Sequence, residues 1–166
     1  ALNAPQVAFV TRASLSTGDN LFVSSSMPVR DLEWFGGDCS LLHVWSNRGA
    51  NGIDGVIASA IGVAIATRQK TLVLLGDVAF LHDSSSLTAL ADRDVDLKIV
   101  VTDNDGGGIF HYLPKPKLYR SKYLKSCLAR HTRQIFCRWR KLIGWLRSNA
   151  NRLNNYRSLY RLREVV

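Results

Sequence analysis

The chain has 166 residues, 46% of them apolar, which is enough to build a hydrophobic core without disulfides or structural metals. No run of about 18 apolar residues occurs, which argues against a membrane-spanning helix, and three widely spaced cysteines argue against a disulfide framework. The sequence opens without an initiator methionine or an export leader, so we expect a cytoplasmic fragment of a longer protein.

The net charge of +9 is distributed very unevenly along the chain. Residues 1–114 hold 7 Lys and Arg against 12 Asp and Glu, whereas residues 115–166 hold 15 Lys and Arg and a single acid, Glu164. Of the 12 glycines, 11 lie in the first part. We therefore expect a folded domain over residues 1–114 and a basic tail over residues 115–166, so that the overall charge describes neither part.

Residues 1–114 alternate between β-rich runs and helical patterns. In chain order we predict a strand over 21–25, a strand over 41–45, a helix over 55–68, a strand over 71–75, a helix over 84–92 that begins at a run of serines, and a strand over 97–101. Strands that lack strict alternation and are separated by helices are typical of a parallel sheet covered on both faces. We therefore predict an α/β fold with three layers.

The residues with the richest chemistry follow the predicted strands. Asp77 comes directly after the strand over 71–75, and Asn104 follows the strand over 97–101, 27 positions later. Ligands of parallel sheets bind beyond the carboxyl ends of the strands, so these two oxygen-bearing side chains are expected side by side. Mg²⁺ prefers such oxygens, and glycines around them let the backbone approach an anion. The pattern predicts a diphosphate bridged by Mg²⁺.

The spacing of Gly76-Asp77 and Asn104 resembles the diphosphate- and metal-binding motif of thiamine diphosphate enzymes. Within them, four blocks in order resemble the menaquinone-pathway synthases of 2-succinyl-5-enolpyruvyl-6-hydroxy-3-cyclohexene-1-carboxylate. The blocks are 25–31 (SSMPVRD), 46–55 (SNRGANGIDG), 76–83 (GDVAFLHD) and 103–110 (DNDGGGIF). The resemblance covers about residues 5–114. It implies a thiamine diphosphate-binding fold, the last of three domains, incomplete at its C-terminal end.

The resemblance also implies roles in binding the cofactor. Asp77, Asn104 and the carbonyl of Gly106 would hold Mg²⁺ or Mn²⁺, and the backbone around Gly76 and Val78 would contact the diphosphate. Ile53 would bend the cofactor, with core packing as the alternative for this residue. Two positions depart from the wider pattern, since Val78 replaces a glycine and Asp103 replaces an asparagine.

For the substrates, the resemblance implies carboxylate recognition by Ser26, Arg30 and Arg48, and an apolar wall formed by Ile109 and Phe110. The alternatives are surface arginines in the first case and core packing in the second. Asp54 and Asp83 are expected to cap or brace loops.

The activity implied by the resemblance is that of a transferase in menaquinone biosynthesis. It would decarboxylate 2-oxoglutarate and add the succinyl semialdehyde carbanion to isochorismate, in a homo-oligomer of two or four subunits. The glutamate that activates the cofactor belongs to a different domain, so we predict no turnover by these 166 residues alone. A different thiamine enzyme, such as a decarboxylase or an acetolactate-type synthase, is the alternative within the superfamily.

The basic tail over residues 115–166 departs abruptly from this pattern. We favour translation in a shifted frame as the origin of this tail, and on this explanation we expect no nucleic-acid partner. A diverged end of the domain is another explanation. Basic residues between aromatic ones also suit a nucleic-acid-binding or surface-binding segment, which would make the chain a binding protein that acts through its tail. A helix can be drawn through Ile135, Trp139, Leu142 and Leu146.

Overall fold

The structure is a computed structural model that describes residues 2–49, 51–91, 93–104 and 106–112. The basic tail, and with it the helix drawn through Ile135 to Leu146, lies outside the described residues. The predicted incompleteness of the fold at its C-terminal end also falls there. In the described ranges, no helix has both the length and the apolar character needed to cross a membrane.

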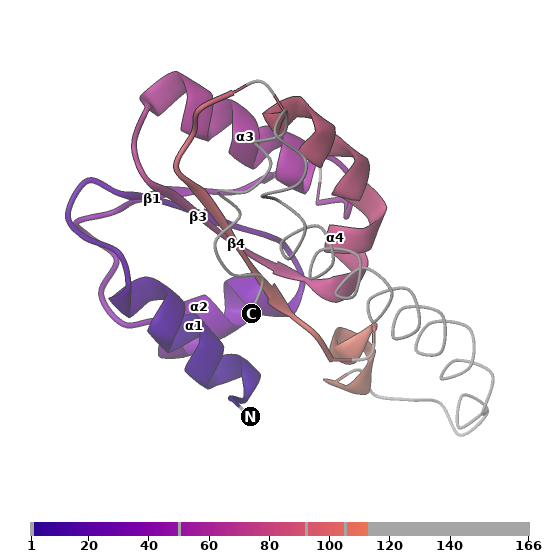
Figure 1. The fold of residues 1–166 in the computed structure, drawn as a ribbon. Coiled ribbons are helices and arrows are strands. Elements are labelled where there is room, and N and C mark those ends of the chain that lie inside the picture. Colours follow the sequence, from indigo (N-terminus) through magenta and orange to yellow (C-terminus); the bar gives the residue numbers. More distant parts are fainter. Residues whose placement is uncertain (1, 50, 92, 105, 113–166) are drawn as a thin grey trace, which may run out of the picture.

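Four parallel strands form one sheet at the centre of the fold (Figure 1). They are β1 (Asn20–Val23), β2 (His43–Trp45), β3 (Thr71–Gly76) and β4 (Leu97–Thr102), in the spatial order β2-β1-β3-β4. All four strands were expected from their apolar runs, and the structure confirms each of them.

Helices cover both faces of this sheet. In the part of the chain that the structure describes, the helical elements are α1 (Ala4–Ala13), α2 (Met27–Phe35), α3 (Val56–Thr67), α4 (Asp77–Asp83) and two 3₁₀ helices, η1 (Ser84–Leu90) and η2 (Gly108–Tyr112). Figure 1 shows α1 and α2 on one side of the strands and α3 on the other. The predicted three-layer α/β fold is therefore confirmed.

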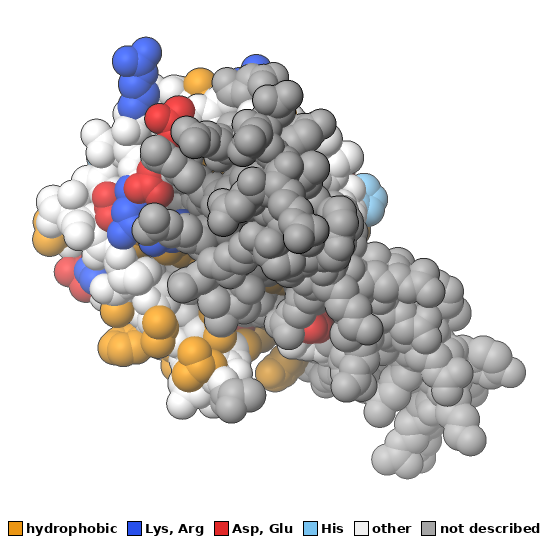
Figure 2. Space-filling view, viewed as in Figure 1, with side chains coloured by type: hydrophobic (Ala, Val, Ile, Leu, Met, Phe, Trp, Pro, Cys, Tyr) orange, Lys and Arg blue, Asp and Glu red, His pale blue; other side chains and the backbone are white. Residues whose placement is uncertain are grey.

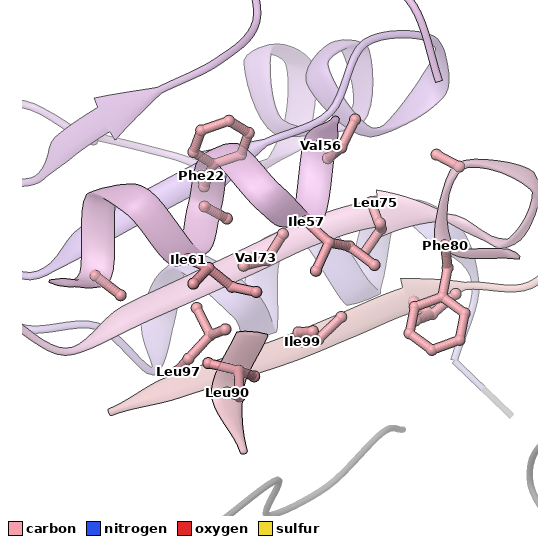
Figure 3. Packing of buried hydrophobic residues seen from close by; sticks show 14 residues of the cluster. Phe22, Val56, Ile57, Ile61, Val73, Leu75, Phe80, Leu90, Leu97 and Ile99 are labelled. Carbon is pink, nitrogen blue, oxygen red and sulfur yellow. The ribbon is translucent and has the colours of Figure 1, made fainter. Parts of the chain in front are cut away.

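Two apolar clusters, one on each face, hold the layers together. Successive strand residues point to opposite faces, so Leu72 and Leu74 join the cluster under α1 and α2, while Val73 and Leu75 join the other. Figure 3 shows the larger cluster, in which Ile57 of α3 packs onto β3 beside further side chains from β4, α4 and η1. The helix over 55–68 was expected to be buried on most sides, and this prediction is wrong, because α3 buries only the face that carries Val56, Ile57, Ala60, Ile61 and Ala64. The other side of the helix is exposed, and Ile65 there is 41% exposed.

The α-helix predicted over residues 84–92, starting at Ser84, Ser85 and Ser86, is found earlier in the chain. Helix α4 starts at Asp77, directly after β3, and residues 84–90 form a 3₁₀ helix instead of an α-helix. The serine hydroxyls explain the difference, because Ser84 Oγ donates to the carbonyl of Leu81 (3.1 Å) and Ser86 Oγ donates to Asp83 Oδ1 (2.6 Å). Such local bonds compete with the bonds of an α-helix.

Helices α1 and α2 had no counterpart in the sequence prediction. Helix α1 begins with a capping box, in which the side chains of Asn3 and Gln6 each bond the backbone of the other residue. In α2, Pro28 lies in the first turn, where a missing N–H costs nothing, so it suits the start of a helix. The two helices expose apolar side chains such as Trp34, which is 63% exposed, and Figure 2 shows apolar side chains on this part of the surface.

One carboxyl group of α2 is buried without compensation. Asp31 is 4% exposed, and its Oδ2 accepts no hydrogen bond within the described part of the chain. Burial raises the pKa of Asp31 above its ordinary value of 3.8. The folded state therefore favours the protonated form, and ionisation of this group opposes folding.

We predict that Asp31→Asn stabilises the protein at neutral pH by about 1 kcal/mol, because it removes a buried charge. A raised pKa means that the folded state binds the proton more tightly, so the native protein loses stability as the pH rises through the raised pKa. The advantage of the variant should accordingly vanish below the unfolded-state pKa of about 4. Urea unfolding at pH 7 and pH 3 measures this, with the exposed Glu33→Gln of the same helix as the control. An equal effect of Asp31→Asn at both pH values would contradict the prediction.

Candidate functional site

The four sequence blocks meet at one edge of the sheet. Each block follows the carboxyl end of a strand: 25–31 follows β1, 46–55 follows β2, 76–83 follows β3 and 103–110 follows β4. Since all the strands are parallel, all four blocks leave the sheet on the same side. This is the edge at which parallel sheets bind ligands.

Asp77 is in direct contact with the block that follows β4. The register pairs Gly76 with Thr102, so the chains leave β3 and β4 at the same level. The Asp77 side chain is buried, with 2% exposed, and its Oδ2 accepts a hydrogen bond of 2.7 Å from the backbone N–H of Gly106. Its Oδ1 accepts a bond of 2.8 Å from the N–H of Val78. The two loops that the sequence pattern pairs therefore meet at the Asp77 carboxylate.

Burial raises the pKa of Asp77. The N–H groups of Val78 and Gly106 act in the opposite direction, because they stabilise the charged form. The carboxyl group of Asp103 raises the pKa further, through its charge and through a hydrogen bond with Asp77. In the sequence, Asp103 stands out only as a departure from the family pattern, which does not predict this contact. Two neighbouring carboxyl groups repel each other when both are ionised, so a bound cation would stabilise the pair.

Asn104 lies against a glycine that leaves no room for a side chain. A Cβ atom at Gly108 would be 2.6 Å from Asn104 Nδ2 and 2.9 Å from its Cγ. The preceding Gly106 and Gly107 have φ values of +82° and +64°, which other residues rarely adopt. Gly106 and Gly107 thus allow a tight turn of the chain, and the missing side chain of Gly108 leaves space for the Asn104 amide.

The oxygen-bearing groups of the loops after β3 and β4 are of the kind that suits a hard divalent cation. The carboxylate of Asp77, the amide of Asn104 and the carbonyl of Gly106 belong to two adjoining loops, and this kind of donor set fits Mg²⁺ or Mn²⁺. Within the described ranges, no group of three or more His, Cys, Asp or Glu residues comes together. The space beside Gly76 is open, since a Cβ there would have no neighbour within 4 Å, which leaves room for an anion at this turn.

The blocks after β1 and β2 also contact each other. Ser25 Oγ donates to Asn51 Oδ1 over 3.3 Å, and Arg30 Nη1 donates to the carbonyl of Ser26 over 2.6 Å. Ser26 has φ 75° and ψ −136°, an unusual conformation for a residue with a side chain. Ser26 and Arg30 are both exposed at the start of α2, so both are accessible to a ligand.

The remaining predicted residues differ in their exposure. Arg48 is exposed, and the Ile53 side chain is 40% exposed, which rules out core packing as the reason for this isoleucine. Ile109 is half-buried, so core packing stays open for it. The side chain of Phe110 lies outside the described residues. Asp83 caps α3 through two backbone N–H groups, which confirms the bracing role expected for it.

Known proteins resemble the chain over the same region. Residues 39–131 match the sequence profile of the family described as "Thiamine pyrophosphate enzyme, C-terminal TPP binding domain"; thiamine pyrophosphate is another name for thiamine diphosphate. The matched range extends past residue 114, so the boundary drawn there stays a prediction.

Curated relatives carry the name 2-succinyl-5-enolpyruvyl-6-hydroxy-3-cyclohexene-1-carboxylate synthase. The protein of Myxococcus xanthus is 46% identical over 114 residues, which cover 68% of this chain and 19% of that protein. The protein of Staphylococcus saprophyticus is 48% identical over 101 residues, which cover 61% of this chain and 18% of that protein. The chain therefore spans about a fifth of the length of these relatives.

A solved structure supports the fold. It is described as a putative thiamin diphosphate-dependent enzyme from Mycobacterium smegmatis, and it superposes with a TM-score of 0.54 at 17% identity over 69% of this chain and 22% of the other. At this identity the likeness concerns the fold alone. The profile match covers more than half of the sequence and leads to one conclusion: the chain belongs to the thiamine pyrophosphate enzymes, through their C-terminal cofactor-binding domain.

Proposed function

We propose that the chain is the diphosphate-binding part of a 2-succinyl-5-enolpyruvyl-6-hydroxy-3-cyclohexene-1-carboxylate synthase, a transferase of menaquinone biosynthesis. The observation that carries the proposal is the 2.7 Å bond from the Gly106 N–H to the Asp77 carboxylate, which joins the two halves of the metal motif. The names and identities of the curated relatives support the choice of reaction.

In this proposal Asp77, Asn104 and the Gly106 carbonyl hold Mg²⁺ or Mn²⁺, and the cation binds the diphosphate. Backbone groups around Gly76 and Val78 would contact the diphosphate, at the open turn beside Gly76 where β3 passes into α4. Bound thiamine diphosphate supplies the carbanion chemistry needed to decarboxylate a 2-oxo acid. The protein contributes binding and orientation.

The substrates in this proposal are 2-oxoglutarate and isochorismate, which both carry carboxylates. Arg30 and Arg48 offer planar guanidinium groups that bind carboxylates through paired hydrogen bonds, and Ser26 adds a hydroxyl. The exposed Ile53 would support the bent cofactor, and Ile109 and Phe110 would supply an apolar wall beside the reacting carbon. The bond that fixes Arg30 on the Ser26 carbonyl supports a joint role for these two residues.

The chain by itself is proposed to bind the cofactor without turning over substrate. It spans about a fifth of its relatives, and the resemblance assigns the activating glutamate to another domain. Assembly as a homo-oligomer and a cytoplasmic location stay predictions.

We predict that the 166-residue chain binds thiamine diphosphate only in the presence of Mg²⁺ or Mn²⁺, and that Asp77→Asn weakens this binding by at least about 100-fold. The substitution keeps the size of the side chain but removes the charge that the cation needs. Isothermal titration calorimetry measures the affinity, and circular dichroism checks that the variant is folded. Metal-independent binding, or binding that survives Asp77→Asn, would contradict the proposed function.

A second prediction concerns the glycine beneath Asn104. In Gly108→Ala the new methyl group displaces the Asn104 amide, a mobile side chain, so the affinity for Mg²⁺ and thiamine diphosphate should fall about 10-fold while the fold persists. Gly62→Ala on the exposed side of α3 is the matched control, because a Cβ there meets nothing within 4 Å. That control should keep full affinity and gain up to about 1 kcal/mol of stability. Equal affinities for the two variants would show that Asn104 is not a ligand.

A further inference from the structure

The first turn of α3 is capped by a residue from a different helix. The residue before α3, Gly55, has no side chain with which to cap it and adopts a left-handed conformation. Asp83, the last residue of α4, takes this role: its Oδ2 accepts hydrogen bonds from the N–H groups of Ile57 (2.6 Å) and Ala58 (3.0 Å). A carboxylate at this position also interacts favourably with the dipole of α3.

The capping carboxylate is itself held in place. Its second oxygen, Oδ1, accepts a hydrogen bond of 2.6 Å from Ser86 Oγ at the start of η1, and the Asp83 side chain is only 7% exposed. Both oxygens are therefore satisfied by short bonds in a buried setting, in which a charged group is costly unless its partners are in place. The geometry between α4 and α3 is fixed by these bonds.

This connection spans two parts of the candidate site. Helix α4 begins with Asp77, and α3 begins directly after the 46–55 block, which carries Arg48 and Ile53. A shift of α3 relative to α4 would move that block relative to the metal motif. Because Asp83 lies at the far end of α4 from Asp77, it can control this distance without touching the ligand.

We infer that Asp83 is a positioning residue that sets the 46–55 block at the correct distance from the metal motif, an inference that rests on the proposed function. Under the proposed function, the organic part of thiamine diphosphate would reach from the metal motif toward Ile53, whereas the diphosphate would be held by the motif. Loss of the Asp83 bonds therefore weakens binding of the whole cofactor and spares binding of pyrophosphate alone. A residue that serves only general stability would affect both ligands alike.

The test compares two ligands, thiamine diphosphate and inorganic pyrophosphate, each titrated calorimetrically with Mg²⁺ into the full chain and its variants. Asp83→Ala removes both acceptors, whereas Asp83→Asn keeps one oxygen that can accept from Ile57 and Ala58. Asp38→Ala is the matched control, since that exposed carboxylate also accepts from a backbone N–H and a serine hydroxyl, both of Ser40. Asp38 lies in the connection from α2 to β2, at the opposite edge of the sheet.

The expected result is selective. In Asp83→Ala the affinity for thiamine diphosphate falls about 10-fold or more, and the affinity for pyrophosphate stays within about twofold. Asp83→Asn restores most of the loss, and Asp38→Ala changes neither affinity. Amide hydrogen exchange at Ile57 and Ala58 should accelerate in Asp83→Ala, which reports the broken bonds without any ligand.

Equal weakening of both ligands, or of neither, in Asp83→Ala would overturn the inference. If Asp83→Ala does not fold, Ser86→Ala takes its place: it frees the carboxylate to rotate and should reduce thiamine diphosphate binding alone, and the absence of a selective loss overturns the inference. A native chain that binds neither ligand refutes the proposed function, and the inference that rests on it falls with it. The native protein thus tests the function, and the variants test Asp83.

Discussion

The hydrogen bond from the Gly106 backbone to the buried Asp77 carboxylate is the interaction on which the site depends. A carboxylate that is 2% exposed needs compensation for its lost hydration, and here two backbone N–H groups provide it. These bonds fix the loops after β3 and β4 against each other. The neighbouring Asp103 leaves the pair with negative charge in excess, and this imbalance suits a divalent cation. Because β3 and β4 are neighbours in the sheet, their loops can form this bond, and it lies at the edge where the metal site is proposed.

Much of this arrangement could be predicted from the sequence. Strand positions followed from apolar runs, and the parallel sheet followed from the alternation of strands with helices, so the common edge of Asp77 and Asn104 was a consequence of topology. The exposure of Ile53 could not be predicted in the same way, because an isoleucine in a loop suits either a core or a ligand. Only its neighbours in space decide between these alternatives.

Other features depend on contacts that sequence patterns do not reveal. The start of α4 at Asp77 was missed because the serine run after it resembles a helix start, although those hydroxyls form local bonds that favour a 3₁₀ helix. The approach of Asp103 to Asp77 follows from the register of β3 and β4, which the spacing alone does not fix. Asp83 was expected to brace a loop, but its partners on α3, 25 and 26 positions earlier, required coordinates.

Site residues differ in how strongly the fold constrains them. Asp77 and Asp83 are buried and bonded to backbone, whereas Arg30 and Arg48 are exposed on the 25–31 and 46–55 blocks. This division matches the proposed roles, since a metal motif needs a fixed geometry and carboxylate recognition needs accessible guanidinium groups. Ser26 combines both features: its side chain is exposed, and its unusual backbone conformation is found at the start of α2, the helix that carries Arg30.

The most direct test of the central claim is to locate a bound ion by paramagnetic broadening in NMR spectra. Mn²⁺ added at substoichiometric amounts with thiamine diphosphate should first broaden the amide signals of Val78 and Gly106, which flank the Asp77 carboxylate. The amides of Asn20 and Thr71, at the other end of the strands, should remain sharp. Broadening that spares Val78 and Gly106, or that is strongest elsewhere in the chain, would contradict the account.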